Sequence, residues 1–94
     1  MLAADPTLGR IARRVKWWEP EDVTLSDLDD FLCRVMALGL WEDMVYAEQT
    51  FGEEAFVHAL AQCPPGVMDP ASWHYWHHRL GKDTVPPLPQ RSFA

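Results

Sequence analysis

The stretch from Asp69 to Leu88, DPASWHYWHHRLGKDTVPPL, constrains the fold of this chain more than any other part of the sequence. Asp69 is suited to cap a helix, Pro70 suits the first helical position, and Gly81 suits the position just past the end. After Gly81 the density of prolines favours an extended polyproline II segment. The sequence therefore predicts a short, sharply bounded helix followed by a stiff tail.

The predicted helix has one apolar face and one histidine face. The side chains on the apolar face recur at helical spacing and are Trp73, Trp76, His77 and Leu80. His74 and His78 lie four residues apart on another face. Because two indoles bury a large area, we expect this helix to anchor the fold, with His77 packed beside Trp73.

The remaining sequence predicts further helices and contains no strand pattern of convincing length. The expected helices cover residues 6–18, the segment from Thr24 or Ser26 to Gly39, residues 40–51 and residues 53–62. The predicted fold is all-α, a small orthogonal bundle of about five short helices. We expect a single helical domain over residues 1–82 and an extended proline-rich C-terminal tail over residues 83–94.

Charge is distributed unevenly along the chain, whose net charge is −6. Residues 17–62 carry eleven acids against Arg34 alone, whereas residues 1–16 carry four bases against Asp5. A strongly acidic centre repels phosphate backbones, so it disfavours nucleic-acid binding and suits a basic protein surface. The sequence shows neither a membrane span nor a signal peptide pattern, and we expect a cytoplasmic protein.

The basic residues near the start form a helical ribbon beside Trp17 and Trp18, and they are Arg10, Arg13, Arg14 and Lys16. Basic and aromatic side chains together are typical of nucleic-acid binding, which makes a small DNA-binding regulator one alternative function. The ribbon has a second interpretation, in which it lies against the acidic middle of the same chain.

The histidines and the clustered carboxylates are candidate metal ligands. His74 and His78 have the spacing of two zinc ligands, but no glutamate follows His74 and no third ligand is close in sequence. A histidine-based metal protein is therefore a further alternative. The carboxylates at residues 27–30 and 53–54 match no EF-hand loop and are typical of a solvated helix face.

Cys33 and Cys63 belong to no CxxC pair and have no base beside them in sequence. We expect both to be small buried thiols rather than nucleophiles. The sequence also contains no glycine-rich phosphate loop and no GxSxG motif. We therefore predict no catalytic residue and no cofactor.

A family resemblance rests on four segments, which are Asp43–Tyr46, Phe51–Phe56, Pro64–Gly81 and Val85–Pro89. They resemble the small bacterial proteins encoded beside AbiEii-type nucleotidyltransferase toxins. The most specific part is the SWxYWHxRLG block followed by PPLP, and the resemblance covers roughly residues 20 to 91. It implies an antitoxin, or partner subunit, of a nucleotidyltransferase, and it implies no catalytic residue in the small protein.

The expected function is therefore a non-catalytic protein-binding module that neutralises a nucleotidyltransferase toxin by direct contact. Aromatic residues and arginine dominate interface hot spots, and a polyproline segment loses little entropy on docking. The expected partner-binding residues are Trp73, Tyr75, Trp76, His77, Arg79, Pro86, Pro87, Leu88, Pro89 and Arg91. Two alternatives stay open: in one, the aromatic residues and the tail serve the chain's own core, and in the other, the helix pairs with itself in a homodimer.

Overall fold

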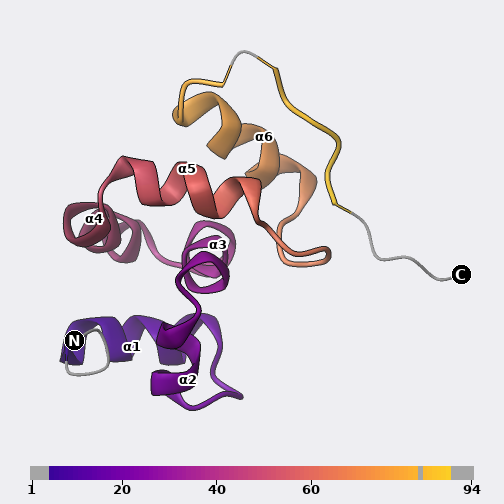
Figure 1. The fold of residues 1–94 in the computed structure, drawn as a ribbon. Helices are drawn as coiled ribbons and strands as arrows, with labels where there is room; N and C mark the ends of the chain where they lie inside the picture. The colour runs from indigo at the N-terminus through magenta and orange to yellow at the C-terminus, as the bar shows by residue number, and fades with distance from the viewer. Residues whose placement is uncertain (1–4, 83, 90–94) are drawn as a thin grey trace, which may run out of the picture.

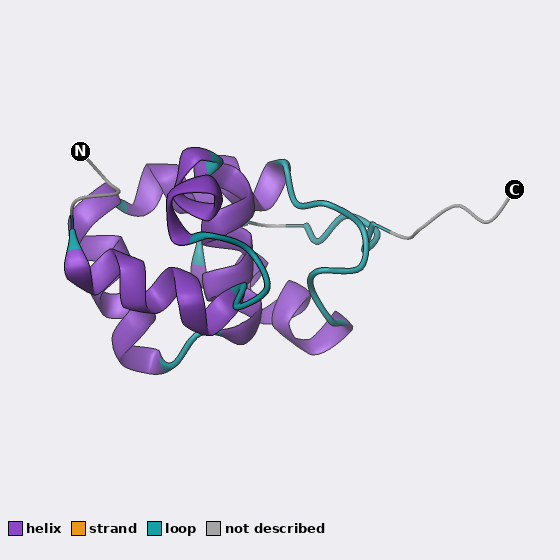
Figure 2. Cartoon of the chain, turned by 90° about the horizontal axis from the view of Figure 1, so that it is seen from below, coloured by secondary structure: helices purple, strands orange, loops and turns teal. Residues whose placement is uncertain are grey.

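The computed structural model describes residues 5–82 and 84–89, which form six helices joined by short loops (Figure 1). The helices are α1 (Pro6–Val15), α2 (Glu21–Ser26), α3 (Leu28–Leu38), α4 (Trp41–Phe51), α5 (Glu53–Ala61) and α6 (Pro70–Arg79). Across the described residues the chain contains no strand (Figure 2). The prediction of a small all-α bundle is confirmed.

Helix α3 occupies the centre of the fold, and each of the other five helices contacts it. Helices α1 and α2 lie on one side of α3, and α5 and α6 lie on the other (Figure 1). The buried residues of α3 are Phe31, Leu32, Cys33, Val35 and Met36. They cover more than one face of the helix, which lets α3 pack in several directions. The centre of the bundle is therefore α3 and not the aromatic helix α6.

The predicted start of α3 at Thr24 or Ser26 is wrong, because these residues belong to the short helix α2. Asp27 caps α3 instead, and its carboxylate accepts a hydrogen bond from the Asp30 N–H at 3.2 Å. Thr24 is buried, and the Ser26 hydroxyl donates to the carbonyl of Val23 at 2.6 Å. A helix of fewer than two turns shows no readable apolar period, so α2 was not predicted.

Helix α1 begins where the sequence predicts, with Asp5 as its cap, but it ends at Val15 and not at Trp18. Gly9 lies inside the helix and faces α2. A Cβ atom on Gly9 would lie 2.9 Å from Oε1 of Glu21, so the glycine allows the two helices to approach closely.

Both predicted boundaries of α6 are confirmed. At its start, the Asp69 carboxylate accepts a hydrogen bond from the Ser72 N–H at 2.9 Å. At its end, Gly81 has a φ of 78° and the Lys82 N–H donates to the His77 carbonyl at 2.9 Å. This is a Schellman cap, which requires the left-handed backbone that glycine supplies.

Candidate protein-binding surface

The structure divides the predicted partner-binding residues of α6 between the core and the surface. Trp73, Trp76 and His77 are buried, whereas Tyr75 and Arg79 are exposed. The difference follows from helical geometry, because only the residues on one face of α6 point toward α3 and α5. In the folded chain, Tyr75 and Arg79 are the members of this set on α6 that a partner can reach.

The buried side chains of α6 are fixed by hydrogen bonds as well as by packing. The Trp76 indole N–H donates to the Met36 carbonyl at 3.0 Å, and the ring stacks on Phe56 with centroids 5.8 Å apart. Nδ1 of His77 lies 2.7 Å from the Trp73 carbonyl oxygen, so this nitrogen carries a proton and donates it. The Trp73 and His77 rings meet edge to face at 4.2 Å, as predicted.

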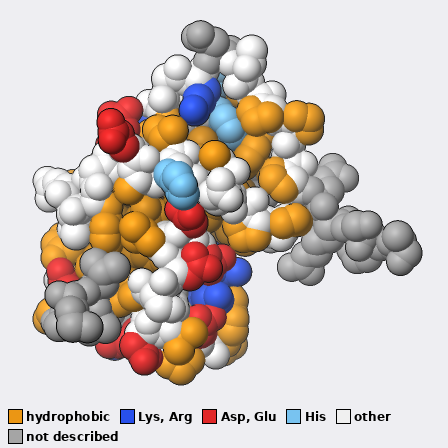
Figure 3. Space-filling model, in the orientation of Figure 1, with side chains coloured by type: hydrophobic (Ala, Val, Ile, Leu, Met, Phe, Trp, Pro, Cys, Tyr) orange, Lys and Arg blue, Asp and Glu red, His pale blue; other side chains and the backbone are white. Residues whose placement is uncertain are grey.

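The described part of the tail, residues 84–89, folds back against α6. The Trp73 indole N–H donates to the Pro86 carbonyl at 2.7 Å. Val85 and Leu88 are half-buried against the core, whereas the Pro86 and Pro87 rings are exposed. Hydrophobic side chains gather along this part of the tail at the upper right of Figure 3. The self-contact that the sequence left open is therefore present for this segment.

The tail, α5 and α6 together line an open pocket of about 340 Å³. Its lining includes Val57, Leu60, Trp73, His77, Pro86 and Pro89. The predicted contacts of Pro86, Pro87, Leu88 and Pro89 with a partner stay a prediction. Arg91, the last residue predicted to bind a partner, lies outside the described residues.

Large apolar side chains are exposed around the start of α4 and the middle of α6. Trp41 has 58% of its surface exposed and Tyr75 has 49%, and both line a hollow of about 410 Å³ that also includes Met36 and Met44. Leu38 and Leu40 are exposed at the adjoining turn between α3 and α4. We define the aromatic surface by the residues Leu38, Leu40, Trp41, Tyr75 and Arg79.

Arg79 holds the aromatic surface together. Its guanidinium carbon lies 4.9 Å from the centroid of the Trp41 ring and 5.2 Å from that of the Trp76 ring. The same group donates to the Tyr75 hydroxyl at 3.0 Å and to the Glu48 carboxylate at 3.1 Å. Stacking and hydrogen bonding thus fix aromatic side chains from α4 and α6 in one arrangement.

Trp41 was not predicted as a surface residue, because its position was counted with the apolar residues of α4. Trp41 is the first residue of that helix and follows its cap residue, Leu40. At a helix end the apolar period does not determine which way a side chain points. Its neighbour across the surface, Tyr75, was predicted from its place among the aromatic residues of α6.

A second exposed aromatic group lies at the turn after α1. Trp17 is 77% exposed and meets Trp18 edge to face, with ring centroids 5.6 Å apart. The guanidinium of Arg34 lies 5.4 Å from the centroid of the Trp18 ring. Trp17 itself packs on less of the chain than Trp41 does, and it provides a matched position for substitution.

The basic ribbon of α1 is largely engaged within the chain. Arg13 forms an ion pair with Glu21 of α2, and Arg14 pairs with Asp43 of α4 at 3.0 Å. Asp43 is only 3% exposed, so this pair lies at the edge of the core. The interpretation of the ribbon as a helix that lies against the acidic middle is supported, and fewer charges are available for a phosphate backbone.

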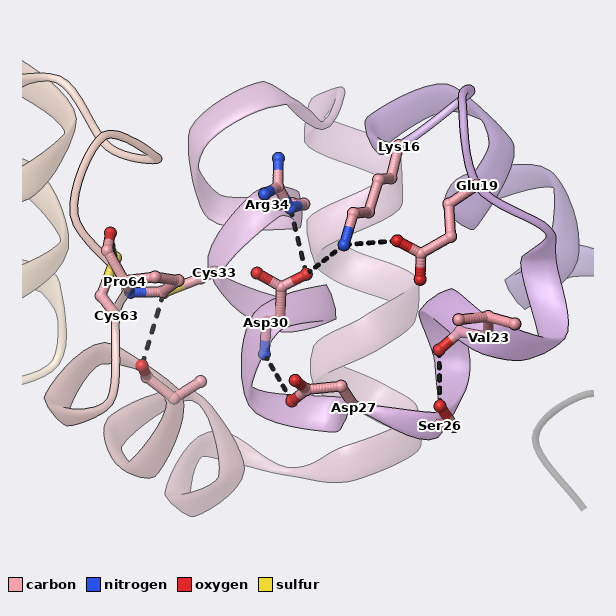
Figure 4. Close-up of polar contacts among 11 residues, drawn as sticks. Lys16, Glu19, Val23, Ser26, Asp27, Asp30, Cys33, Arg34, Cys63 and Pro64 are labelled. Atoms are coloured by element: carbon pink, nitrogen blue, oxygen red, sulfur yellow. Dashed lines mark hydrogen bonds and ion pairs between the residues drawn. The ribbon is translucent and has the colours of Figure 1, made fainter.

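Lys16 belongs to a network shown in Figure 4. Its ammonium group lies 2.6 Å from the Glu19 carboxylate and 3.1 Å from the Asp30 carboxylate. Asp30 also accepts a hydrogen bond from Arg34 at 3.1 Å. The hydrogen bond to Glu19 is the main cause that raises the pKa of Lys16. Acidic and basic side chains consequently meet where α3 adjoins α1 and α2 (Figure 3).

The candidate metal ligands do not come together in one site among the described residues. His74 and His78 are exposed on α6. Within residues 5–82 and 84–89, no group of three His, Cys, Asp or Glu side chains is placed to hold a metal ion. Cys33 and Cys63 are both buried, as predicted.

Comparison with family models, curated proteins and solved structures finds no match for this chain. In the described part of the chain, no helix has the length and apolar character needed to cross a membrane.

Proposed function

We propose that this protein acts by binding another protein through the aromatic surface and catalyses no reaction itself. The observation that carries the proposal is the exposure of Trp41 and Tyr75 side by side around one hollow, held in place by Arg79. Tryptophan, tyrosine and arginine are the residues most enriched in interface hot spots. An exposed aromatic patch of this kind is also typical of interaction sites.

The acidic balance of the chain, with a net charge of −6, favours a basic partner. Glu42 is exposed and follows Trp41 in sequence, and Glu53 and Glu54 are exposed beyond the other end of α4, at the start of α5. None of these three acids forms an ion pair with another described residue. A basic surface on the partner would compensate them and would increase the association rate.

The partner in this proposal is a nucleotidyltransferase, which the protein neutralises in the cytoplasm as an antitoxin. This part rests on the resemblance of the SWHYWHHRLG and PPLP segments. An enzyme that binds nucleotides or RNA needs a basic substrate entrance, since its substrates are polyanions. An acidic protein with an aromatic anchor suits such an entrance, and direct contact there would exclude the substrate.

Affinity capture from the native cells tests this proposal. The tagged wild-type chain should retain a nucleotidyltransferase, identified by mass spectrometry, and Trp41→Ala should lose it. Trp17→Ala is the matched control, because it removes another exposed indole from a different turn, the one after α1. Circular dichroism should show that both variants keep the wild-type helix content, since both side chains are exposed.

Two outcomes would overturn parts of the proposal. Recovery of no nucleotidyltransferase by the wild-type chain would remove the proposed partner. Retention of the enzyme by Trp41→Ala, with loss by Trp17→Ala, would move the binding surface to the turn after α1. Binding of duplex DNA by the wild-type chain at physiological salt would favour the regulator instead.

A further inference from the structure

The two cysteines of the chain lie together, although thirty positions separate them in the sequence. Cys33 comes from the centre of α3 and is 0% exposed, and Cys63 follows the end of α5 and is 8% exposed. Figure 4 shows the two side chains next to each other, where the end of α5 meets α3. The Cys33 thiol also has the Ala59 carbonyl as an acceptor at 3.4 Å.

The two thiols differ in access and in acidity. Cys63 lies in the loop between α5 and α6, between the exposed residues Gln62 and Pro65, whereas Cys33 is enclosed by the core. The neighbouring Cys33 thiol lowers the pKa of Cys63, and the nearby Arg34 charge acts in the same direction. The neighbouring Cys63 thiol and burial raise the pKa of Cys33. Cys63 is therefore the thiol that ionises and meets solutes first.

We propose that Cys33 and Cys63 form an oxidation site, in which a hydroperoxide converts the two thiols into an intramolecular disulfide. The proposal rests on the neighbouring positions of the two side chains, on the loop position of Cys63 and on the enclosure of Cys33. It requires no partner protein and is independent of the proposed function.

The reaction has two steps. In the first, the Cys63 thiolate attacks the peroxide, the O–O bond breaks, and Cys63 becomes a sulfenic acid while the other peroxide oxygen leaves as water or an alcohol after taking up a proton. In the second, the Cys33 sulfur attacks the Cys63 sulfur, the S–O bond breaks, and water leaves with the Cys33 proton. The peroxide gains two electrons, and the two thiols lose them.

The disulfide would join the central helix α3 to the loop that leads into α6. It would close a long loop of chain and so restrict the unfolded state, which raises the melting temperature of the folded chain. A reductant would reverse the change. The site would therefore couple the stability of the α5–α6 connection to the redox state of its surroundings.

Treatment of the reduced full-length chain with hydrogen peroxide tests the proposal. The intact mass should fall by two hydrogen atoms, peptide mapping without reductant should find Cys33 linked to Cys63, and dithiothreitol should reverse both. The melting temperature of the oxidised monomer should exceed that of the reduced monomer. In Cys33→Ser, peroxide should stop at a sulfenic acid on Cys63, which dimedone traps.

The reciprocal variant Cys63→Ser should slow the oxidation of Cys33 by about tenfold or more, because the remaining thiol is enclosed. Cys33→Ala replaces Cys33→Ser if the hydroxyl prevents folding. A wild-type chain that stays reduced, or that forms only intermolecular dimers, would overturn the proposal. Oxidation of Cys33 at the wild-type rate in Cys63→Ser would overturn the order of the two steps.

Discussion

Helices α1 and α6 each carry the residues that suggest a binding function, yet the structure uses them in different ways. The basic residues of α1 mostly pair with acids of the same chain, as Arg13 does with α2 and Arg14 with α4. The aromatic residues of α6 are divided, with Trp73 and Trp76 in the core and Tyr75 on the surface. Composition alone therefore does not show whether a residue type serves the fold or a partner.

The division of α6 into buried and exposed aromatic residues can be tested by substitution, because the neighbours Tyr75 and Trp76 have opposite roles. Trp76 is 2% exposed, stacks on Phe56 and donates to the Met36 carbonyl. We expect Trp76→Ala to lower the free energy of unfolding by about 3–5 kcal/mol, because it leaves a large cavity and an unpaired carbonyl. Urea denaturation followed by circular dichroism measures this loss.

Tyr75→Ala is the matched variant, since Tyr75 is half exposed and adjacent to Trp76. Its loss of stability should stay below about 1 kcal/mol, as is usual for surface substitutions. Equal losses for the two variants would mean that the division of α6 into core and surface is incorrect.

The structural role of the α1 ion pairs can be tested at Asp43, the buried acid that pairs with Arg14. The Asp43 carboxylate also accepts a hydrogen bond from the Leu40 N–H at 2.9 Å at the start of α4. Asp43→Ala should cost about 1–3 kcal/mol, because it removes a charge-assisted hydrogen bond and leaves Arg14 unpaired. Asp43→Asn keeps an acceptor for Leu40 and should cost less.

Arg10→Ala is the control for α1, because the described residues give Arg10 only a hydrogen bond to Thr7. Its unfolding free energy in urea should match the wild-type value within about 0.5 kcal/mol. If Asp43→Ala were as mild as Arg10→Ala, the internal ion pairs of α1 would have no structural role.

The smallest expected effect concerns pH and the cap of α1. The hydrogen bond that Tyr46 donates to Asp5, at 2.7 Å, is the main cause that lowers the pKa of the Asp5 carboxyl below 3.8. A lowered pKa in the folded state stabilises the fold above the unfolded pKa, and this contribution is lost as the pH falls through the folded value. When the pH is lowered below about 4, the free energy of unfolding should therefore fall less in Tyr46→Phe than in the wild type.

An NMR titration of the Asp5 carboxyl group measures this directly, with a higher midpoint expected in Tyr46→Phe than in the wild type. Tyr75→Phe is the control, because its hydroxyl contacts Arg79 of α6 instead of Asp5. Identical Asp5 midpoints in the wild type and Tyr46→Phe would show that the cap does not depend on Tyr46.

Much of the fold could be predicted from the sequence, since apolar spacing, proline and glycine are local signals. Asp69 and Gly81 defined α6 correctly because capping depends on a few neighbouring residues. Helix α2 could not be predicted, because its stability comes from packing on α1 and α3 and not from its own short sequence. The central position of α3 likewise depends on contacts between distant segments.

The candidate site was predicted only in part. Tyr75 and Arg79 were identified from composition, but Trp41 was not, because its exposure depends on how α4 and α6 pack. The indoles of Trp73 and Trp76 carry the same chemical signal as that of Trp41, yet they are buried. Helical spacing predicts which side chains of α6 share its apolar face. The exposure of Trp41 depends instead on how separate helices pack together.

The dissociation constant of the complex with the captured nucleotidyltransferase, measured by isothermal titration calorimetry, tests the central claim most directly. We expect Trp41→Ala to weaken binding by about 30-fold or more, as for a hot-spot residue, and Trp17→Ala to change it by less than about twofold. An unchanged dissociation constant for Trp41→Ala would contradict the claim that the protein binds its partner through the aromatic surface.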